Sequence, residues 1–171
     1  AFEGCSSLTS ITIPESVTMI DEYAFAYCSG LTKIEIQSSV TAIRMGIFYD
    51  CDNIEEVEIP SSVERLGGSL FSSCDNLISV TIPDNITFID SYTFSNCYKL
   101  TNVNIPSKLK SVGVYAFYEC NSLTYIEIPK DVREFGHYAF YGCENLDVVI
   151  NNSSNLIYRD FAFEGCKSVT W

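Results

Sequence analysis

The side chains with the widest range of chemistry are eight cysteines that recur at one fixed interval. They occupy positions 5, 28, 51, 74, 97, 120, 143 and 166, so each one follows the last by 23 residues. Cysteines form disulfides, bind metals or act as thiolate nucleophiles. The chain has no Cys-x-x-Cys pair and His137 is its single histidine, which argues against a zinc site.

The strict interval predicts a structural role for these cysteines, because equivalent residues of stacked repeats point the same way. Equivalent Cβ atoms would then lie about 4.8 Å apart, which is one strand spacing. A disulfide requires a Cβ separation of about 3.8 Å. We therefore expect eight reduced, buried thiols that pack as small hydrophobic groups.

Two carboxylates at equivalent positions, Glu35 and Glu58, could also do chemistry. A separation of about one strand spacing loosely suits the carboxylate pair of a retaining glycosidase, so a carbohydrate-active β-coil enzyme is one alternative. However, the unbroken 23-residue interval leaves no insertions from which to build substrate-shaping loops. The sequence also lacks a Ser/His/Asp set beyond His137 and a glycine-rich phosphate loop. We expect no enzyme and no cofactor, and we place His137 on the surface.

The residues between the cysteines predict the elements that hold these groups in place. The third and sixth residues after each cysteine are Leu, Ile or Val, and the eighth is almost always Ile. Apolar residues two apart with polar neighbours predict a short strand with one face in the core, at residues 9–13 of the first repeat. Proline follows this strand at 14, 60, 83, 106 and 129, and it ends the strand because it has no N–H for a ladder.

Two further segments complete each repeat. Apolar residues three apart, such as Val17 and Ile20, predict a second short extended segment on the opposite side of the coil. A Tyr-Ala-Phe stretch then follows in three repeats, and we expect it to form a single helical or 3₁₀ turn. Eight phenylalanines, from Phe2 to Phe163, keep the 23-residue interval and should form an internal ladder.

A fixed period between about 20 and 50 residues is the signature of a repeat architecture. One repeat cannot bury its own apolar residues, so stacked repeats must share a core. The expected fold class is a β-rich repeat solenoid, a right-handed coil with a parallel, concave sheet and short extended segments on the other side. Residues 1–171 should form one such domain of about seven repeats, a fragment without recognisable caps.

The repeat at 143–165 departs from the pattern and predicts a locally different turn. Asn151 and Asn152 replace the Ile-Pro pair of the other repeats. Counting from Cys143 places Val149 inward, and it places Asp147, Val148 and Ile150 on the outer face of the sheet.

The repeat Ala-Phe-x-x-Cys-x-x-Leu-x-x-Ile-x-Ile-Pro-x-x-Val-x-x-Ile resembles the BspA-type (Treponema pallidum type) leucine-rich repeat, and the resemblance covers essentially the whole chain. It implies a leucine-rich-repeat solenoid with a concave parallel sheet. The resemblance also implies a surface protein of the kind found in oral and gut anaerobes, spirochaetes and mucosal protists. Such proteins are associated with adhesion to host matrix proteins, other microbes and epithelium. The family brings no catalytic residues, so only the scaffold positions carry over.

The formal net charge of −12 limits the partners. It argues against nucleic acid and against an anionic membrane surface, because both attract Lys and Arg. The acidity is uneven: residues 1–75 hold twelve Asp and Glu against three Lys and Arg, whereas residues 76–171 hold ten against seven. No apolar run is long enough for a membrane-spanning helix, so we expect no membrane insertion by this chain.

The variable residues of the predicted concave face are the first candidate binding site. Repeat proteins bind partners through such surfaces. Charges cluster on adjacent strands there, and they predict a docking patch for a basic segment, a weak divalent-cation site or a solvated sheet face. The candidate residues are Lys33, Glu35, Glu55, Glu56, Glu58, Asn102, Asn104, Tyr125 and Glu127.

A second candidate is a ridge of tyrosines, which offer apolar area with a polar tip. The alternative is half-burial of these rings against the Ala-Phe segment. The ridge consists of Tyr92, Tyr115, Tyr118, Tyr138 and Tyr141.

Three asparagines, Asn85, Asn151 and Asn152, begin glycosylation sequons that matter only in a eukaryotic source, and Asn85 could be accessible at its corner.

Together these features predict a non-enzymatic protein-binding or adhesion module of a microbial protein that is extracellular or anchored at the cell surface. The expected ligand is a host matrix protein such as fibronectin or fibrinogen, or a glycan. The alternative function is a structural spacer that displays other domains.

Overall fold

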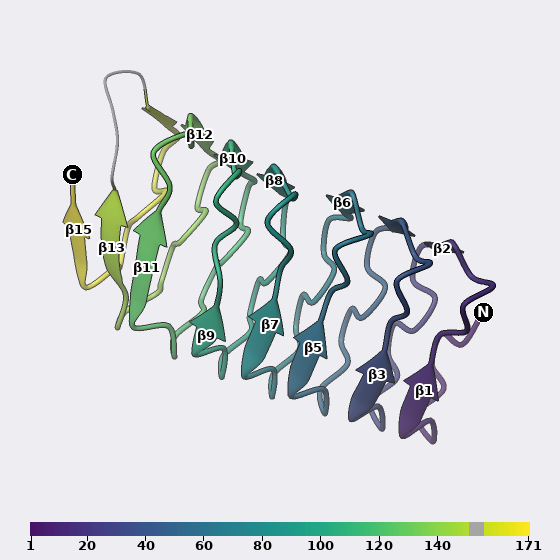
Figure 1. The fold of residues 1–171 in the computed structure, drawn as a ribbon. Coiled ribbons are helices and arrows are strands. Elements are labelled where there is room, and N and C mark those ends of the chain that lie inside the picture. Colours follow the sequence, from purple (N-terminus) through teal and green to yellow (C-terminus); the bar gives the residue numbers. More distant parts are fainter. Residues whose placement is uncertain (151–155) are drawn as a thin grey trace.

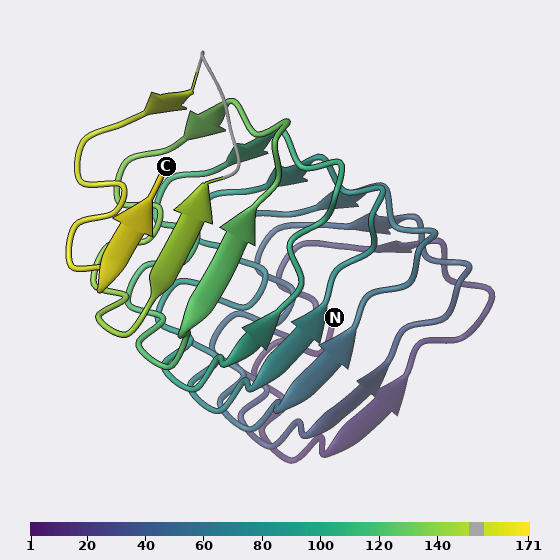
Figure 2. The same ribbon diagram turned by 60° about the vertical axis from the view of Figure 1, so that its left-hand side comes forward.

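Each repeat forms one coil of a stack, with a short strand on each of two sides (Figures 1 and 2). The computed structural model describes residues 1–150 and 156–171. The two termini lie at opposite ends of the stack (Figure 1). The predicted parallel solenoid is therefore confirmed.

The strands on the first side are β1 (Ser10–Thr12), β3 (Lys33–Glu35), β5 (Glu56–Glu58), β7 (Ser79–Thr81), β9 (Asn102–Val103), β11 (Tyr125–Ile128), β13 (Asp147–Ile150) and β15 (Ser168–Thr170). The strands on the second side are β2 (Met19–Ile20), β4 (Ala42–Ile43), β6 (Arg65–Leu66), β8 (Phe88–Ile89), β10 (Ser111–Val112), β12 (Glu134–Phe135) and β14 (Ile157–Tyr158). Both predicted strand positions are confirmed, since β1 falls within residues 9–13 and β2 ends at Ile20.

Neighbouring strands pair in parallel, and most pairs join equivalent residues of successive repeats. Ile11 pairs with Ile34, for example, and Val57 pairs with Val80. Hydrogen-bonded pairing is interrupted at three places in the described chain: between β3 and β5, between β9 and β11, and between β6 and β8. We call these interruptions seams. They divide both sides of the stack into shorter sheets.

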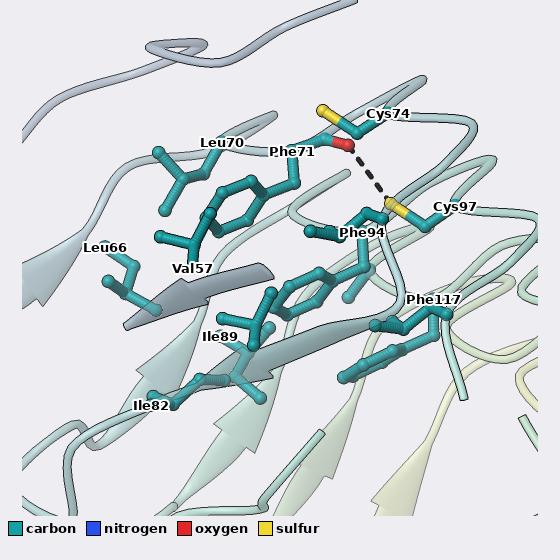
Figure 3. Packing of buried hydrophobic residues seen from close by; sticks show 14 of the residues in the cluster. Val57, Leu66, Leu70, Phe71, Cys74, Ile82, Ile89, Phe94, Cys97 and Phe117 are labelled. Carbon is teal, nitrogen blue, oxygen red and sulfur yellow. Dashed lines mark hydrogen bonds between the residues drawn. The ribbon is translucent and has the colours of Figure 1, made fainter. Parts of the chain in front are cut away.

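The phenylalanine ladder runs through the core as a column of parallel rings. Successive rings from Phe2 to Phe163 stack with centroid distances of 4.9 to 6.1 Å. Figure 3 shows Phe71, Phe94 and Phe117 one above another, with Ile89 beside them. The rings between the two ends are fully or almost fully buried. This column confirms the prediction that the phenylalanines are internal.

The cysteines also make hydrogen bonds, because each thiol after the first donates to a carbonyl oxygen of the directly preceding coil. Cys97 Sγ donates to the carbonyl oxygen of Phe71 in the preceding coil (Figure 3). The equivalent bond recurs from Cys28 to Cys166, with Sγ–O distances of 3.0 to 3.3 Å. All eight cysteines are free. The expectation of eight buried thiols is wrong at the ends, since Cys5 is exposed and Cys166 is only partly buried.

The predicted helical turn around Tyr-Ala-Phe is wrong. In each coil the fifth residue before the cysteine has a positive φ, as does the residue directly before the cysteine. Tyr115 and Glu119, for example, have φ angles of 56° and 55°. Two left-handed residues four apart cannot continue a right-handed helix, so the chain makes successive tight turns instead.

No helix in the described residues is long and apolar enough to cross a membrane.

The repeat that begins at Cys143 changes register by one residue. Tyr125 pairs with Asp147, which is 22 positions later. A slip of one residue exchanges the two faces of a strand. Val148 and Ile150 are consequently buried and Val149 is half-buried, so the predicted inward position of Val149 and the outward positions of Val148 and Ile150 are wrong.

The slip has a visible backbone origin. In the second coil, the N–H groups of Thr32 and Lys33 both donate to the Thr9 carbonyl oxygen. Two successive residues therefore share one acceptor before β3 begins, and the pairing advances by one residue less than the chain does. In the seventh coil, the Asp147 N–H donates to the Thr124 carbonyl oxygen and β13 begins at once. The predicted local departure at Asn151 and Asn152 lies outside the described residues.

Candidate protein-binding face

Alternation along the first-side strands produces an outward row of polar side chains. In β3 and β5, Ile34 and Val57 point into the core, and the flanking Lys33, Glu35 and Glu58 are exposed. This follows from the period of two in a strand. We call the outward side of β1, β3, β5, β7, β9, β11, β13 and β15 the sheet face. It corresponds to the predicted concave face.

Lys33 and Glu35 form an ion pair within β3. Lys33 Nζ lies 2.8 Å from Glu35 Oε1, and Thr12 Oγ1 donates to Glu35 Oε2 at 3.2 Å. The hydrogen bond from Lys33, with a smaller one from Thr12, lowers the pKa of Glu35. Glu35 in turn raises the pKa of Lys33. Because both side chains are exposed, this ion pair adds little to the stability of the fold. It does mean that the positive charge of Lys33 is paired with a carboxylate of the same strand.

Glu55, Glu56 and Glu58 lie on or directly before β5, and all three are exposed. Among the described residues, no Lys or Arg nitrogen lies within 4.0 Å of their carboxylates. Lys33 pairs with Glu35 and not with these three carboxylates. Three uncompensated negative charges therefore project from one strand of the sheet face.

A groove follows the seam between β3 and β5. One hollow of about 500 Å³ is lined by Lys33, Glu55, Glu56 and Glu58, and by the strand backbones around them. A second hollow of about 390 Å³ continues past Glu35 and Glu58 toward Gln37 and Pro60. The two hollows share Ile34 and Glu58, so they form one groove along the strands. Glu35 and Glu58 occupy equivalent positions across this seam, where like charges disfavour close pairing.

Two other uses of the groove, binding of a metal ion and catalysis by a carboxylate pair, can be compared with its geometry. Among the described residues, no three His, Cys, Asp or Glu converge closely enough to hold a metal, so the divalent-cation alternative has no support. A glycosidase acid would need a raised pKa, whereas Lys33 lowers the pKa of Glu35. The lowered pKa therefore argues against Glu35 as the general acid of such a pair.

The remaining sheet-face candidates gather near the second seam, between β9 and β11. A hollow of about 470 Å³ there is lined by Asn102, Tyr125 and Glu127. Tyr125 is 56% exposed, and its hydroxyl donates to Glu127 Oε2 at 3.3 Å. Asn104 is also exposed, and its amide accepts a hydrogen bond from the Ile82 N–H and donates one to the Ile82 carbonyl oxygen. Asn104 thus extends the pairing of β7.

The five ridge tyrosines form two adjoining stacks. Tyr92, Tyr115 and Tyr138 stack face to face with centroid distances of 5.1 and 4.9 Å. Tyr118 and Tyr141 form a parallel stack at 5.5 Å, and Tyr115 meets Tyr118 edge to face. Tyr92 is exposed and the other four rings are half-buried, so the ridge is continuous but offers mainly ring edges and hydroxyl groups.

The outlying candidates are placed as follows. His137 is exposed, as predicted. Asn85 is half-buried and its Nδ2 donates to the Val63 carbonyl oxygen at 2.7 Å, so the atom that glycosylation would modify is already engaged. The suggested accessibility of Asn85 is therefore wrong. The sequons at Asn151 and Asn152 lie outside the described residues.

Sequence reasoning missed the seams and the groove that follows one of them. Gln37 stands where five other repeats have proline, and it lines the groove together with Pro60 of the next coil. However, the seam between β9 and β11 keeps proline at both corners, Pro106 and Pro129, so a missing proline does not predict the seams in general.

The repeats match one known family over nearly the whole chain. A family model described as BspA type Leucine rich repeat region matches in six copies, over residues 1–123 and 87–170. Comparison with curated protein sequences gave no match. Proteins with such repeats are generally non-enzymatic and generally bind other proteins.

Solved bacterial leucine-rich-repeat proteins share the fold. The Treponema pallidum leucine-rich repeat protein is 33% identical, with a TM-score of 0.79 over 85% of this chain and 68% of its own. A leucine-rich repeat protein from Bacteroides ovatus is 29% identical, with a TM-score of 0.56 over 92% of this chain. A leucine rich cell surface protein from Faecalibacterium prausnitzii, 23% identical with a TM-score of 0.50, covers 99% of this chain and 61% of its own and shows the fold alone.

The chain spans about half the length of the Bacteroides ovatus protein, 53%. The period, the stacked phenylalanines and the parallel coils all agree with the matched family model. This chain belongs to the BspA-type leucine-rich repeat family.

Proposed function

We propose that this chain is a protein-interaction module whose groove between β3 and β5 docks a basic, extended segment of a partner. One observation carries the proposal: Glu55, Glu56 and Glu58 project beside a groove of about 500 Å³ without a cationic partner in the described chain. Exposed charge of one sign along a groove steers an oppositely charged segment and sets its register. The uneven charge of the chain supports the same location, since residues 1–75 are the more acidic half.

The setting we propose is adhesion by a secreted or surface-anchored microbial protein. The family and the cell surface protein of similar fold support this setting. A host matrix protein such as fibronectin or fibrinogen is the first partner to test. The family assignment supports a non-enzymatic role.

The experiment is a binding titration of fibronectin and fibrinogen on the immobilised chain, measured over a series of salt concentrations. The triple variant Glu55→Gln/Glu56→Gln/Glu58→Gln should bind at least about tenfold more weakly, mainly through a slower association rate. A matched control is Glu119→Gln/Glu144→Gln/Glu164→Gln, which changes the charge equally around a separate hollow beside Tyr141. Equal weakening by both variants would contradict the assignment of the groove.

A spacer is the second candidate, favoured by the uninterrupted column of stacked phenylalanines along the stack. A spacer needs a stiff axis and an inert surface. If neither matrix protein nor a library of basic peptides binds the chain at low salt, the spacer function is preferred over the docking groove.

A further inference from the structure

We propose that a second surface, on the edge next to β10, β12 and β14, binds a linear anionic polysaccharide. This surface lies on the opposite strand side from the sheet face and is independent of the docking groove. We call it the basic strip. It consists of Lys108, Lys110, Lys130, Arg133 and Arg159.

The backbone brings these cations together on three successive coils. Lys110 directly precedes β10, Arg133 directly precedes β12, and Arg159 directly follows β14. The Arg133 N–H donates to the Lys110 carbonyl oxygen at 2.7 Å, and the Ile157 N–H donates to the Arg133 carbonyl oxygen at 2.8 Å. Lys110 and Arg133 thus occupy equivalent positions on coils about 4.8 Å apart, and Arg159 lies three residues beyond the equivalent position on the next coil, so a charged chain that crosses the coils obliquely would meet all three cations.

Neighbouring carboxylates neutralise only part of the strip. Asp131 lies 3.0 Å from Lys110 Nζ and 3.8 Å from an Arg133 nitrogen. The hydrogen bond from Lys110 lowers the pKa of Asp131, and the charges of Lys130 and Arg133 add to the effect, so one carboxylate faces three cations.

Three other carboxylates belong to the balance. Glu134 pairs with Arg159 at 3.3 Å, Asp84 accepts a hydrogen bond from the Ser107 N–H next to Lys108, and Asp160 is exposed directly after Arg159. Five cations therefore stand against four carboxylates, which leaves a small positive surplus. Half of the ten Lys and Arg residues lie in this strip, although the chain as a whole carries a net charge of −12.

An exposed aromatic ring borders the strip. Phe88 in β8 pairs with Ser111 in β10 and is 41% exposed. The Lys110 N–H donates to the carbonyl oxygen of Thr87, the residue before Phe88. Aromatic faces pack on the apolar faces of sugar rings, and Lys and Arg hold sulfate or carboxylate groups. The two features together fit a charged sugar chain better than they fit an acidic peptide.

The charge of the rest of the chain favours a single extended ligand chain. Outside the strip only five Lys and Arg remain, and Asp and Glu outnumber them, so a duplex or a bilayer, which covers a broad area, would also meet repulsive charge. A single polysaccharide chain contacts only a line of residues. This is why we assign the strip to an anionic polysaccharide rather than to nucleic acid or lipid.

The test is calorimetric titration of the folded chain with a heparin oligosaccharide of defined length, over a salt series that begins near 50 mM. The variant Lys110→Gln/Arg133→Gln should bind about tenfold more weakly or worse, and the slope of log affinity against log salt should become shallower. The matched control Lys33→Gln/Arg44→Gln removes the same charge from two exposed ion pairs in the acidic half, and its affinity should match the unaltered chain.

Phe88→Ala separates sugar recognition from simple charge attraction. It should weaken heparin binding about threefold or more with an unchanged salt slope, because the variant loses ring packing and no charge. Melting curves of all variants should match the unaltered chain, since every altered side chain is exposed. Neutral dextran should not bind.

Three results would overturn the assignment. The first is no heparin binding at the lowest salt, and the second is equal weakening by the control variant. The third is equal or tighter binding of polyglutamate, a nucleic-acid duplex or anionic vesicles, with no effect of Phe88→Ala.

Discussion

Cys97 Sγ lies 3.1 Å from the carbonyl oxygen of Phe71, one coil earlier, and donates a hydrogen bond to it. The same carbonyl accepts the N–H of Cys74 within its own coil. The Phe71 carbonyl oxygen is therefore shared by two coils, and the thiol supplies the link between them. A buried acceptor that loses one partner costs free energy, which makes the link measurable.

Replacing one linking thiol should lower stability by more than the loss of its volume suggests. We expect Cys97→Ala to reduce the free energy of unfolding by about 1–3 kcal/mol, through the lost hydrogen bond and a small cavity. Urea denaturation provides the measurement. Cys5→Ala is the control, because Cys5 is exposed and should change stability by less than about 0.5 kcal/mol. Equal effects at both positions would contradict the link.

Alkaline pH should destabilise the fold through the same thiols. Burial raises the pKa of Cys51 and of Cys166 to about 12, from an ordinary value of 9.0. The unfolded chain thus loses these protons before the folded chain does. Stability is fully present below about pH 9 and is lost as the pH rises toward about 12. Denaturation at about pH 8 and pH 10 measures the fall, which should be smaller in Cys51→Ala. An identical fall in that variant would contradict the assignment to Cys51.

The phenylalanine column should tolerate no truncation at its centre. Phe94 is fully buried between Phe71 and Phe117, with centroid distances of 5.6 and 5.1 Å. We expect Phe94→Ala to lower the free energy of unfolding by about 3–5 kcal/mol. Phe88→Ala, at an exposed ring in the neighbouring β8, should cost less than about 1 kcal/mol. Thermal melting of the two variants makes the comparison, and similar melting temperatures would show that the column is not the core.

The change of register in β13 can be tested by a pair of substitutions one residue apart. Val148 is fully buried and Val149 is half-buried. We expect Val148→Asp to destabilise the chain by about 3 kcal/mol or more, because it buries a carboxylate without a partner. Val149→Asp should cost about 1 kcal/mol or less. The reverse order would restore the register that the 23-residue interval predicts.

The sequence predicted the features that depend on repetition. Equivalent letters at a fixed interval must stack, so the burial of Phe94 and Leu100, the strand around Ile34 and the corner at Pro60 follow from spacing alone. The family resemblance rested on the same letters. The confirmed parts of the fold are therefore those in which every repeat makes the same contact.

The features that the sequence did not predict depend on differences between coils or on the direction of single bonds. The thiol of Cys97 was expected to be a packing group, since nothing in the spacing shows where its S–H points. The hydrogen bonds between the amide of Asn104 and the backbone of Ile82 in the preceding coil were not predicted, because they depend on one side chain of one coil. The left-handed φ of Tyr115 was hidden because tyrosine is seldom found in that conformation. The register of β13 depends on its starting one residue earlier than the strands of the preceding coils, at Asp147.

The same distinction holds for the candidate site. The charges of Glu55, Glu56 and Glu58 could be read from their positions, and their exposure is confirmed. The groove beside them could not, because part of its lining spans the seam between β3 and β5, which the 23-residue interval does not predict. Whether this groove binds a partner stays a prediction.

The three seams are staggered, and this arrangement affects how the stack responds to force. Where β3 and β5 are unpaired, β4 and β6 remain hydrogen-bonded, and where β6 and β8 are unpaired, β5 and β7 remain hydrogen-bonded. The same holds at the third seam, where β10 and β12 bridge the gap between β9 and β11. Every boundary between these coils thus keeps at least one hydrogen-bonded ladder. Under tension, such a stack should bend at its seams and rupture in one cooperative event, rather than separate into independent blocks.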